Sequence, residues 1–170
     1  MIISQAREAA QEIFGKHQRH EVTFDLSASD ITILKKGAEA IKGAKAPKGW
    51  RLSEWAATIA STVRAVEAVD DTAERHTCRI WDINSLKRAV SYAYIKGTAL
   101  PIPHLHLPQK AYSLFFRLDE LPLKSPYYDA AQTAEEKINK LEREEARLLK
   151  LKEELQREIA EINDQLEGEA

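Results

Sequence analysis

The 170-residue sequence has one cysteine and no long apolar run, and each absence excludes a class of protein. The single cysteine, Cys78, excludes an intrachain disulfide framework and suits a reducing compartment. No apolar stretch approaches the length of a membrane span. Residues 1–14 contain Arg7, Glu8 and Glu12 where a signal peptide requires apolar residues. The sequence therefore predicts a cytoplasmic protein with no membrane partner.

The motifs of common catalytic and metal sites are also missing. The chain has no glycine-rich phosphate loop, no Gly-x-Ser-x-Gly elbow and no paired carboxylates in a recognisable frame. Cys78 could act as a nucleophile beside a histidine, but a lone cysteine among apolar residues is more typical of a core. His104 lies two residues from His106, and His76 two from Cys78, without the spacing of a zinc site. We predict no catalytic residue, no metal, no cofactor and no enzymatic activity.

What the sequence does contain is a seven-residue apolar repeat over residues 134–170. With Ile138 as position a, apolar residues occupy most a and d positions and charged residues predominate elsewhere, which is the pattern of a coiled coil. A single helix cannot bury such a stripe, so the repeat predicts self-association. The residues expected to form the oligomer interface are Ile138, Leu141, Leu148, Leu149, Leu151, Leu155, Ile159, Ile162 and Leu166.

Two polar residues within the repeat bear on how the helices pair. Glu145 and Lys152 occupy successive a positions, so each would face its own copy in a parallel dimer in register. Antiparallel pairing instead aligns every core layer between residues 134 and 166 and never stacks Glu145 on itself. Leu149 and Leu151 widen the stripe, as in four-helix bundles. We predict an antiparallel dimer or tetramer; the alternative is that the helix folds back on its own chain.

Residues 1–124 are expected to form a mostly helical domain with one or two short strands. A linker over residues 125–133 is expected to connect this domain to the C-terminal helix over residues 134–170. Apolar residues at helical spacing predict five helices. Three of them have predicted cap residues: one runs from Ser27 or Ser29 to Gly43, one from Ser53 through Val66, and one from Asp82 or Asn84 to Gly97. The other two cover residues 2–16 and residues 109–121, the latter with Pro108 at the first position. Alternation predicts strands over 21–26 and 78–83. The predicted fold class is mainly α, with a long C-terminal coiled-coil or bundle helix.

The formal net charge of −2 hides an uneven distribution of charge along the chain. Residues 1–124 contain 18 Lys or Arg against 14 Asp or Glu, whereas residues 125–170 contain 7 against 13. Basic residues concentrate between positions 35 and 51, where Glu39 is the one acidic residue. This basic cluster consists of Lys35, Lys36, Lys42, Lys45, Lys48 and Arg51.

Lysines on a helix end and on a glycine-hinged loop can follow a phosphate backbone, and the amides at the start of the next helix can add an anion site. The basic cluster therefore predicts contact with nucleic acid; the alternative is a solvated surface. Trp50, Trp55 and Trp81 could stack on bases, although their helical or strand spacing is also typical of packing residues.

Residues 21–66 show the order strand, capped helix, loop and second capped helix, which resembles the order in ribbon-helix-helix DNA-binding domains. In that family the outward strand residues read bases in the major groove. Here those positions are Glu21, Thr23 and Asp25, two of which are carboxylates. A helix-turn-helix within residues 30–97 is a second possibility, although no diagnostic turn is present.

These patterns together predict an oligomeric DNA-binding protein, most simply a small transcriptional regulator of bacterial or phage type. The basic cluster would hold phosphates, and the C-terminal helix would join the binding domains so that occupied sites reinforce one another. The rival prediction is a protein-interaction adaptor or inhibitor that binds a partner complex without nucleic acid. Steep salt dependence of binding would distinguish the first from the second.

Overall fold

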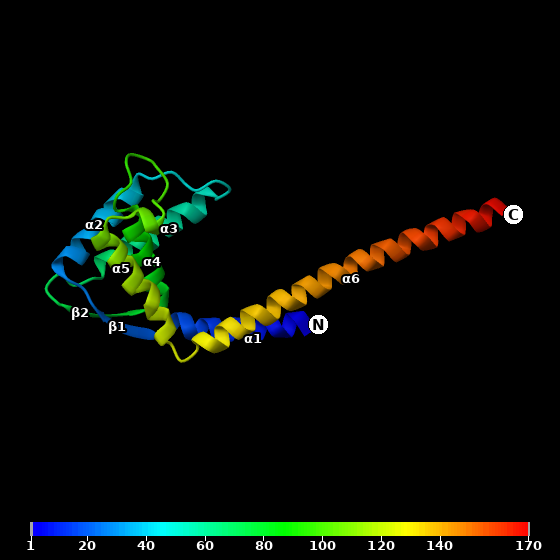
Figure 1. The fold of residues 1–170 in the computed structure, drawn as a ribbon, viewed down its shortest axis with the longest axis horizontal. Helices are drawn as coiled ribbons and strands as arrows, with labels where there is room; N and C mark the ends of the chain where they lie inside the picture. Colours follow the sequence, from blue (N-terminus) through cyan, green and yellow to red (C-terminus); the bar gives the residue numbers. More distant parts are fainter. Residues whose placement is uncertain (1, 170) are drawn as a thin grey trace. The chain divides into compact units, whose positions relative to one another are not determined.

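A computed structural model describes residues 2–169 as a mainly helical protein with two short antiparallel strands and a long C-terminal helix, which confirms the predicted fold class (Figure 1). The elements are α1 (Ile2–Arg19), β1 (Glu21–Asp25), α2 (Ala28–Lys42), α3 (Leu52–Glu67), β2 (Arg75–Arg79), α4 (Ile80–Tyr92), the 3-10 turn η1 (His104–His106), α5 (Gln109–Glu120), the 3-10 turn η2 (Leu121–Lys124) and α6 (Tyr128–Glu169). Within the described residues, none of the helices combines the length and apolarity that crossing a membrane requires.

The chain divides into two compact units. The first, Gly15–Tyr128, is called the head here. The second, called the tail unit, combines residues 2–14 of α1 with residues 129–169 of α6. The long helix begins at Tyr128, so it includes part of the segment expected to be a linker.

Several element boundaries differ from those predicted. The strand expected over 78–83 is Arg75–Arg79, and α4 begins at Ile80 directly after it, so neither Asp82 nor Asn84 caps that helix. Ser53 does not cap α3, because Arg51 is the extended N-cap residue and Ser53 lies inside the first turn. The helix expected to reach Gly97 ends at Tyr92.

The start of α2 is fixed by a capping box. The Ser27 hydroxyl accepts from the Asp30 amide at 3.1 Å, and the Asp30 carboxylate accepts from the Ser27 amide at 2.9 Å. Asp30 is buried and also accepts from Arg117 of α5 at 2.8 Å. Burial alone would raise the pKa of this carboxyl, but the bonds from Arg117 and Ser27 outweigh burial and lower the pKa. The cap predicted from sequence thus also ties α5 to α2.

The core of the head lies where α2, α4 and α5 meet beneath the inner face of the strands. Its most completely buried large apolar residues are Leu34, Ile80, Ile83, Leu86, Val90, Leu114 and Leu118, whereas Ile41 belongs to a second, smaller cluster with Trp55 and Tyr92. Helices α2 and α4 lie in close contact at Gly37, where an added Cβ would lie 1.7 Å from the Ala89 carbonyl oxygen. A side chain at position 37 would therefore separate the two central helices of the head.

The two strands form an antiparallel ribbon within the chain, with Val22 opposite Cys78 and Thr23 opposite Thr77. Val22 is buried and Phe24 half-buried, whereas Glu21, Thr23 and Asp25 are exposed. The outward face also carries the exposed Arg75, Thr77 and Arg79 of β2, and Arg75 lies 3.6 Å from Asp25. The strand, helix, loop and helix expected over 21–66 are present, but β1 pairs with β2, which lies outside that segment.

In the tail unit, α1 supports the first part of α6. Arg7 donates to Glu142 at 3.1 Å, Ala10 is buried, and Ile138 and Leu141 are half-buried. Beyond this region the apolar side chains of α6 are 49–60% exposed. This tail face consists of Leu148, Leu149, Leu151, Leu155, Ile159, Ile162 and Leu166.

Candidate nucleic-acid interface

The six residues of the basic cluster fall into two groups in the structure. Lys35, Lys36 and Lys42, called the helix cations here, lie on α2. The other three, called the loop cations, lie in the α2–α3 loop or at its end: Lys45, Lys48 and Arg51. The two groups have different partners.

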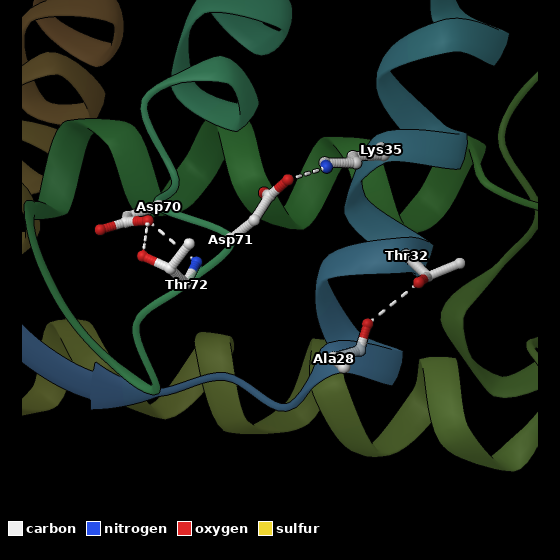
Figure 2. A network of polar contacts seen from close by, with 6 residues as sticks. All are labelled: Ala28, Thr32, Lys35, Asp70, Asp71 and Thr72. Atoms are coloured by element: carbon white, nitrogen blue, oxygen red, sulfur yellow. Dashed lines mark hydrogen bonds and ion pairs between the residues drawn. The ribbon is translucent and has the colours of Figure 1, made fainter.

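The helix cations are engaged within the head. Lys35 forms an ion pair with Asp71 in the α3–β2 loop, as Figure 2 shows. Lys42 pairs with Glu39 at 2.9 Å, and this hydrogen bond raises the pKa of the ammonium group. The Lys36 Nζ lies 4.2 Å from the centre of the Tyr94 ring, a cation–π contact.

The surface around Lys35 and Lys42 is rich in acidic residues. Both lysines line a hollow of about 600 Å³ between α2 and α3, which four carboxylates also line: Glu39, Glu67, Asp70 and Asp71. Asp70 accepts from the amide and hydroxyl of Thr72 (Figure 2), and these bonds lower its pKa. Because carboxylates outnumber lysines here, this surface does not favour a polyanion.

The loop cations are exposed, and across residues 2–169 no carboxylate forms an ion pair with any of them. Glu54 lies one helical turn from Arg51, but its carboxylate accepts from the Arg51 backbone amide at 3.4 Å and leaves the guanidinium unpaired. The loop therefore offers three cations to solvent within seven residues.

The backbone of this loop is held in place by contacts that the sequence pattern does not reveal. The Trp50 amide donates to the Pro47 carbonyl at 3.1 Å, and Gly49 has φ of +87°, as expected for the third residue of a type II turn. The indole of Trp55 donates to the Ala44 carbonyl at 3.1 Å. Lys45 donates its amide to Thr98 at 3.4 Å, which connects the loop to the segment after α4.

Beside the loop lies a hollow of about 390 Å³ with an unusual lining. Aromatic residues and prolines predominate, and its one strong cation is Arg88 of α4. The aromatic residues that line this hollow are Trp50, Trp55, Tyr92, His104 and Phe115. Trp50 is 44% exposed and its ring contacts Trp55 edge-on, while His104 stacks on Phe115 with ring centres 5.3 Å apart. A volume near 390 Å³ is within the range of ligand pockets, roughly 300–1,000 Å³.

Arg88 was not singled out in the sequence. Its Nη1 donates to Thr62 Oγ1 at 3.1 Å, and among the described residues no carboxylate pairs with it. Burial lowers the pKa of this guanidinium from its usual value. The sequence spacing could have identified Arg88 as a neighbour of Trp81. Arg88 lies seven residues after Trp81, so both side chains fall on the same side of a helix.

The remaining candidates from the sequence are dispersed. His76 contacts the Ala73 carbonyl at 2.9 Å, and His104 stacks on aromatic rings of α5. Among the described residues, no three His, Cys, Asp or Glu side chains are grouped so that they could hold a metal ion. Trp55 is buried, as expected of a packing residue, whereas Trp81 is 57% exposed.

The environment of Cys78 raises the pKa of its thiol, whereas the environment of a reactive cysteine lowers it. Burial, with smaller contributions from Asp82 and Glu21 and an opposing one from Arg79, raises the pKa of its thiol to about 12. We expect iodoacetamide at pH 8 to label native Cys78 at least about 100-fold more slowly than the unfolded chain, because the thiolate is the nucleophile. The rate in 6 M guanidinium chloride is the control. Native and denatured rates within tenfold of each other would show that the thiol is accessible and ionised.

No protein-family model, curated protein sequence or solved structure matches this chain. The resemblance of residues 21–66 to ribbon-helix-helix domains therefore rests on the order of elements alone.

Proposed function

We propose that this protein is an oligomeric nucleic-acid-binding protein, which binds through the loop cations and self-associates through the tail face. The observation that carries the proposal is the set of three exposed, unpaired cations at Lys45, Lys48 and Arg51 on a loop held in place by hydrogen bonds. Cations of this kind release counterions when they neutralise phosphates, which favours binding to nucleic acid at low salt.

The six residues of the basic cluster predicted from sequence differ in whether they already have partners in the head. Lys35 and Lys42 already neutralise carboxylates of the head, and they lie in a hollow that four carboxylates line. A phosphate approaching them would be repelled by those carboxylates. We therefore assign phosphate contact to the loop cations. Regulation of transcription stays a prediction from sequence.

Self-association is supported by the tail face. Seven large apolar side chains of α6 remain half exposed, and in water a stripe of this kind favours burial against another helix. Antiparallel pairing is proposed because it avoids stacking Glu145 on Glu145 and Lys152 on Lys152. Joined copies would bind adjacent sites on one nucleic acid with a higher effective concentration than separate copies.

The test compares two triple variants that remove the same charge. Lys45→Ala, Lys48→Ala and Arg51→Ala together should weaken binding to a labelled 30-nucleotide DNA at least about tenfold, measured by fluorescence anisotropy at 0.1 M salt. The control replaces Lys35, Lys36 and Lys42 with alanine and should change affinity by less than about threefold, because those cations already have partners. Equal losses in both variants would mean that net charge, not the loop, determines binding.

A protein-binding adaptor is the rival, and the exposed tail face is the observation that favours it. The same titration separates the two functions. If the wild-type protein binds none of single-stranded DNA, single-stranded RNA and duplex DNA at 50 mM salt, the proposed function is wrong and the adaptor is preferred.

A further inference from the structure

Two hollows share one lining residue, Arg88 of α4, the helix that packs against α3 (Figure 1). The first is the aromatic hollow beside the loop. The second, of about 360 Å³, lies toward the start of α4 and includes Trp81. The other residues that line it are small or neutral: Ala57, Thr58, Ser61, Asn84 and Ser85. Together the two hollows are called the α3–α4 groove here.

Each hollow is lined by an exposed tryptophan ring, and the Arg88 guanidinium is common to both hollows. Trp50 is 44% exposed at one hollow and Trp81 is 57% exposed at the other, while Arg88 lines both hollows. Along α4, the distance from Trp81 to Tyr92 is about 16 Å at 1.5 Å per residue. A stacked strand rises about 3.4 Å per nucleotide, so a few nucleotides fit along this length.

The net positive charge of the residues that line the groove favours binding of an anion. No Asp or Glu lines either hollow among the described residues, whereas four carboxylates line the hollow between α2 and α3. Among residues 2–169, the hydrogen bond from Arg88 goes to the Thr62 hydroxyl, and no carboxylate accepts from it. A partly buried guanidinium without a carboxylate can form charge-assisted, bidentate hydrogen bonds with a phosphate.

We propose that the α3–α4 groove binds single-stranded nucleic acid, with bases stacked on Trp50 and Trp81 and a phosphate held by Arg88. The proposal rests on the proposed function and specifies which form of nucleic acid is bound. Trp50 belongs to the same loop as Lys48 and Arg51, so a strand leaving the groove meets the loop cations. Stacking on tryptophan needs an unpaired base, because the faces of duplex bases are already covered by their neighbours.

The experiment titrates the full-length protein with three labelled ligands: oligo(dT) of 20 nucleotides, oligo(rU) of the same length and a 20-base-pair duplex. Wild type should bind at least one single strand about tenfold or more tightly than the duplex, with quenching of tryptophan fluorescence. The variant Trp50→Ala with Trp81→Ala should bind that strand at least about 30-fold more weakly, because two stacking contacts of about 1–3 kcal/mol each are lost, and should bind the duplex unchanged. Trp50→Phe with Trp81→Phe should retain most of the affinity, because phenylalanine also stacks.

Two further variants make the test specific. Phe116→Ala removes an aromatic ring that is 51% exposed on α5 but lines neither hollow, and it should leave single-strand affinity unchanged. Arg88→Gln should reduce the slope of log K against log salt by about 0.7 for a single strand, as expected for one lost phosphate contact. Circular dichroism of each variant verifies that it is folded.

The outcomes separate this inference from the proposed function. Equal binding of single strand and duplex, unaffected by loss of both tryptophans, would overturn the inference and leave the proposed function standing. Absence of binding to all three ligands at 50 mM salt would overturn both.

Discussion

Replacing Gly37 with alanine is expected to destabilise the head by about 3 kcal/mol or more. The added Cβ would lie 1.7 Å from the Ala89 carbonyl oxygen, and this atom belongs to the backbone of α4, so it cannot move aside as a side chain could. Overpacking in a core typically costs about 1–3 kcal/mol, and here the two central helices must separate. Such a loss is a large fraction of the roughly 5–15 kcal/mol that holds a domain folded.

Tryptophan fluorescence during urea unfolding measures this effect, because Trp50, Trp55 and Trp81 all lie in the head. A loss of about 3 kcal/mol should lower the urea midpoint by roughly 1–3 M. The matched control is Gly43→Ala, where φ is −99° and an added Cβ meets nothing within 4 Å. Its free energy of unfolding should stay within about 0.5 kcal/mol of that of the wild type, so its urea midpoint should change little. A Gly37→Ala midpoint equal to that of the control would contradict the close approach of α2 and α4.

Replacing Leu155 and Ile159 with glutamate is expected to prevent the proposed self-association of the tail face. Each side chain is at least half exposed in the single chain, and burying one in a helix seam contributes about 1.5–3 kcal/mol. A dimer would lose four such side chains, so its association should weaken by about 10⁴-fold or more. Sedimentation equilibrium at micromolar concentration should show an oligomer for wild type and a monomer for the variant.

The control for the tail face is Lys150→Gln with Arg157→Gln. It changes the net charge by the same amount at positions on the opposite side of the helix, and it should leave the oligomer intact. A wild-type protein that sediments as a monomer would show that the tail face does not self-associate.

Cysteine crosslinking tests the antiparallel direction in a Cys78→Ser background. Antiparallel pairing about residue 150 places Leu148 opposite Lys152 of a second copy. Leu148→Cys and Lys152→Cys proteins should therefore crosslink on oxidation when mixed and neither should crosslink alone. Efficient crosslinking of the Leu148→Cys protein alone would indicate parallel helices.

The parts of the fold that the sequence predicts are those fixed by local signals. The Ser27 cap and the apolar stripe of α2, the alternation of β1, the helix after Pro108 and the long C-terminal helix are all present. In each, the pattern that identifies the element lies within a few turns or strand residues. Such patterns depend little on contacts with distant parts of the chain.

The boundaries that the sequence misplaced are fixed by distant contacts. The β2 strand is set by pairing with β1, and its inward residues are His76 and Cys78, which give a weak alternation signal. The start of α3 follows the turn at Gly49 and the bond from Trp55 to Ala44, so Ser53 is not needed as a cap. Neither arrangement can be derived from local propensity.

The candidate site shows the same division. The sequence identifies the basic cluster, but not that Lys35 pairs with Asp71, which is 36 residues away. Nor does it place Arg88 beside Trp50, since that proximity depends on how α4 packs against the loop. A run of charged residues can be recognised in the sequence. Which of those charges are neutralised by distant partners can be recognised only from the folded structure.

The most direct test of the central claim is the salt dependence of binding to a single-stranded DNA, measured from 50 to 300 mM salt for wild type and for the variant lacking all three loop cations. The account predicts a linear fall of log K with log salt for wild type and a slope about 2 units shallower for the variant, because three phosphate contacts at about 0.7 each are lost. Identical slopes for the two proteins would contradict it.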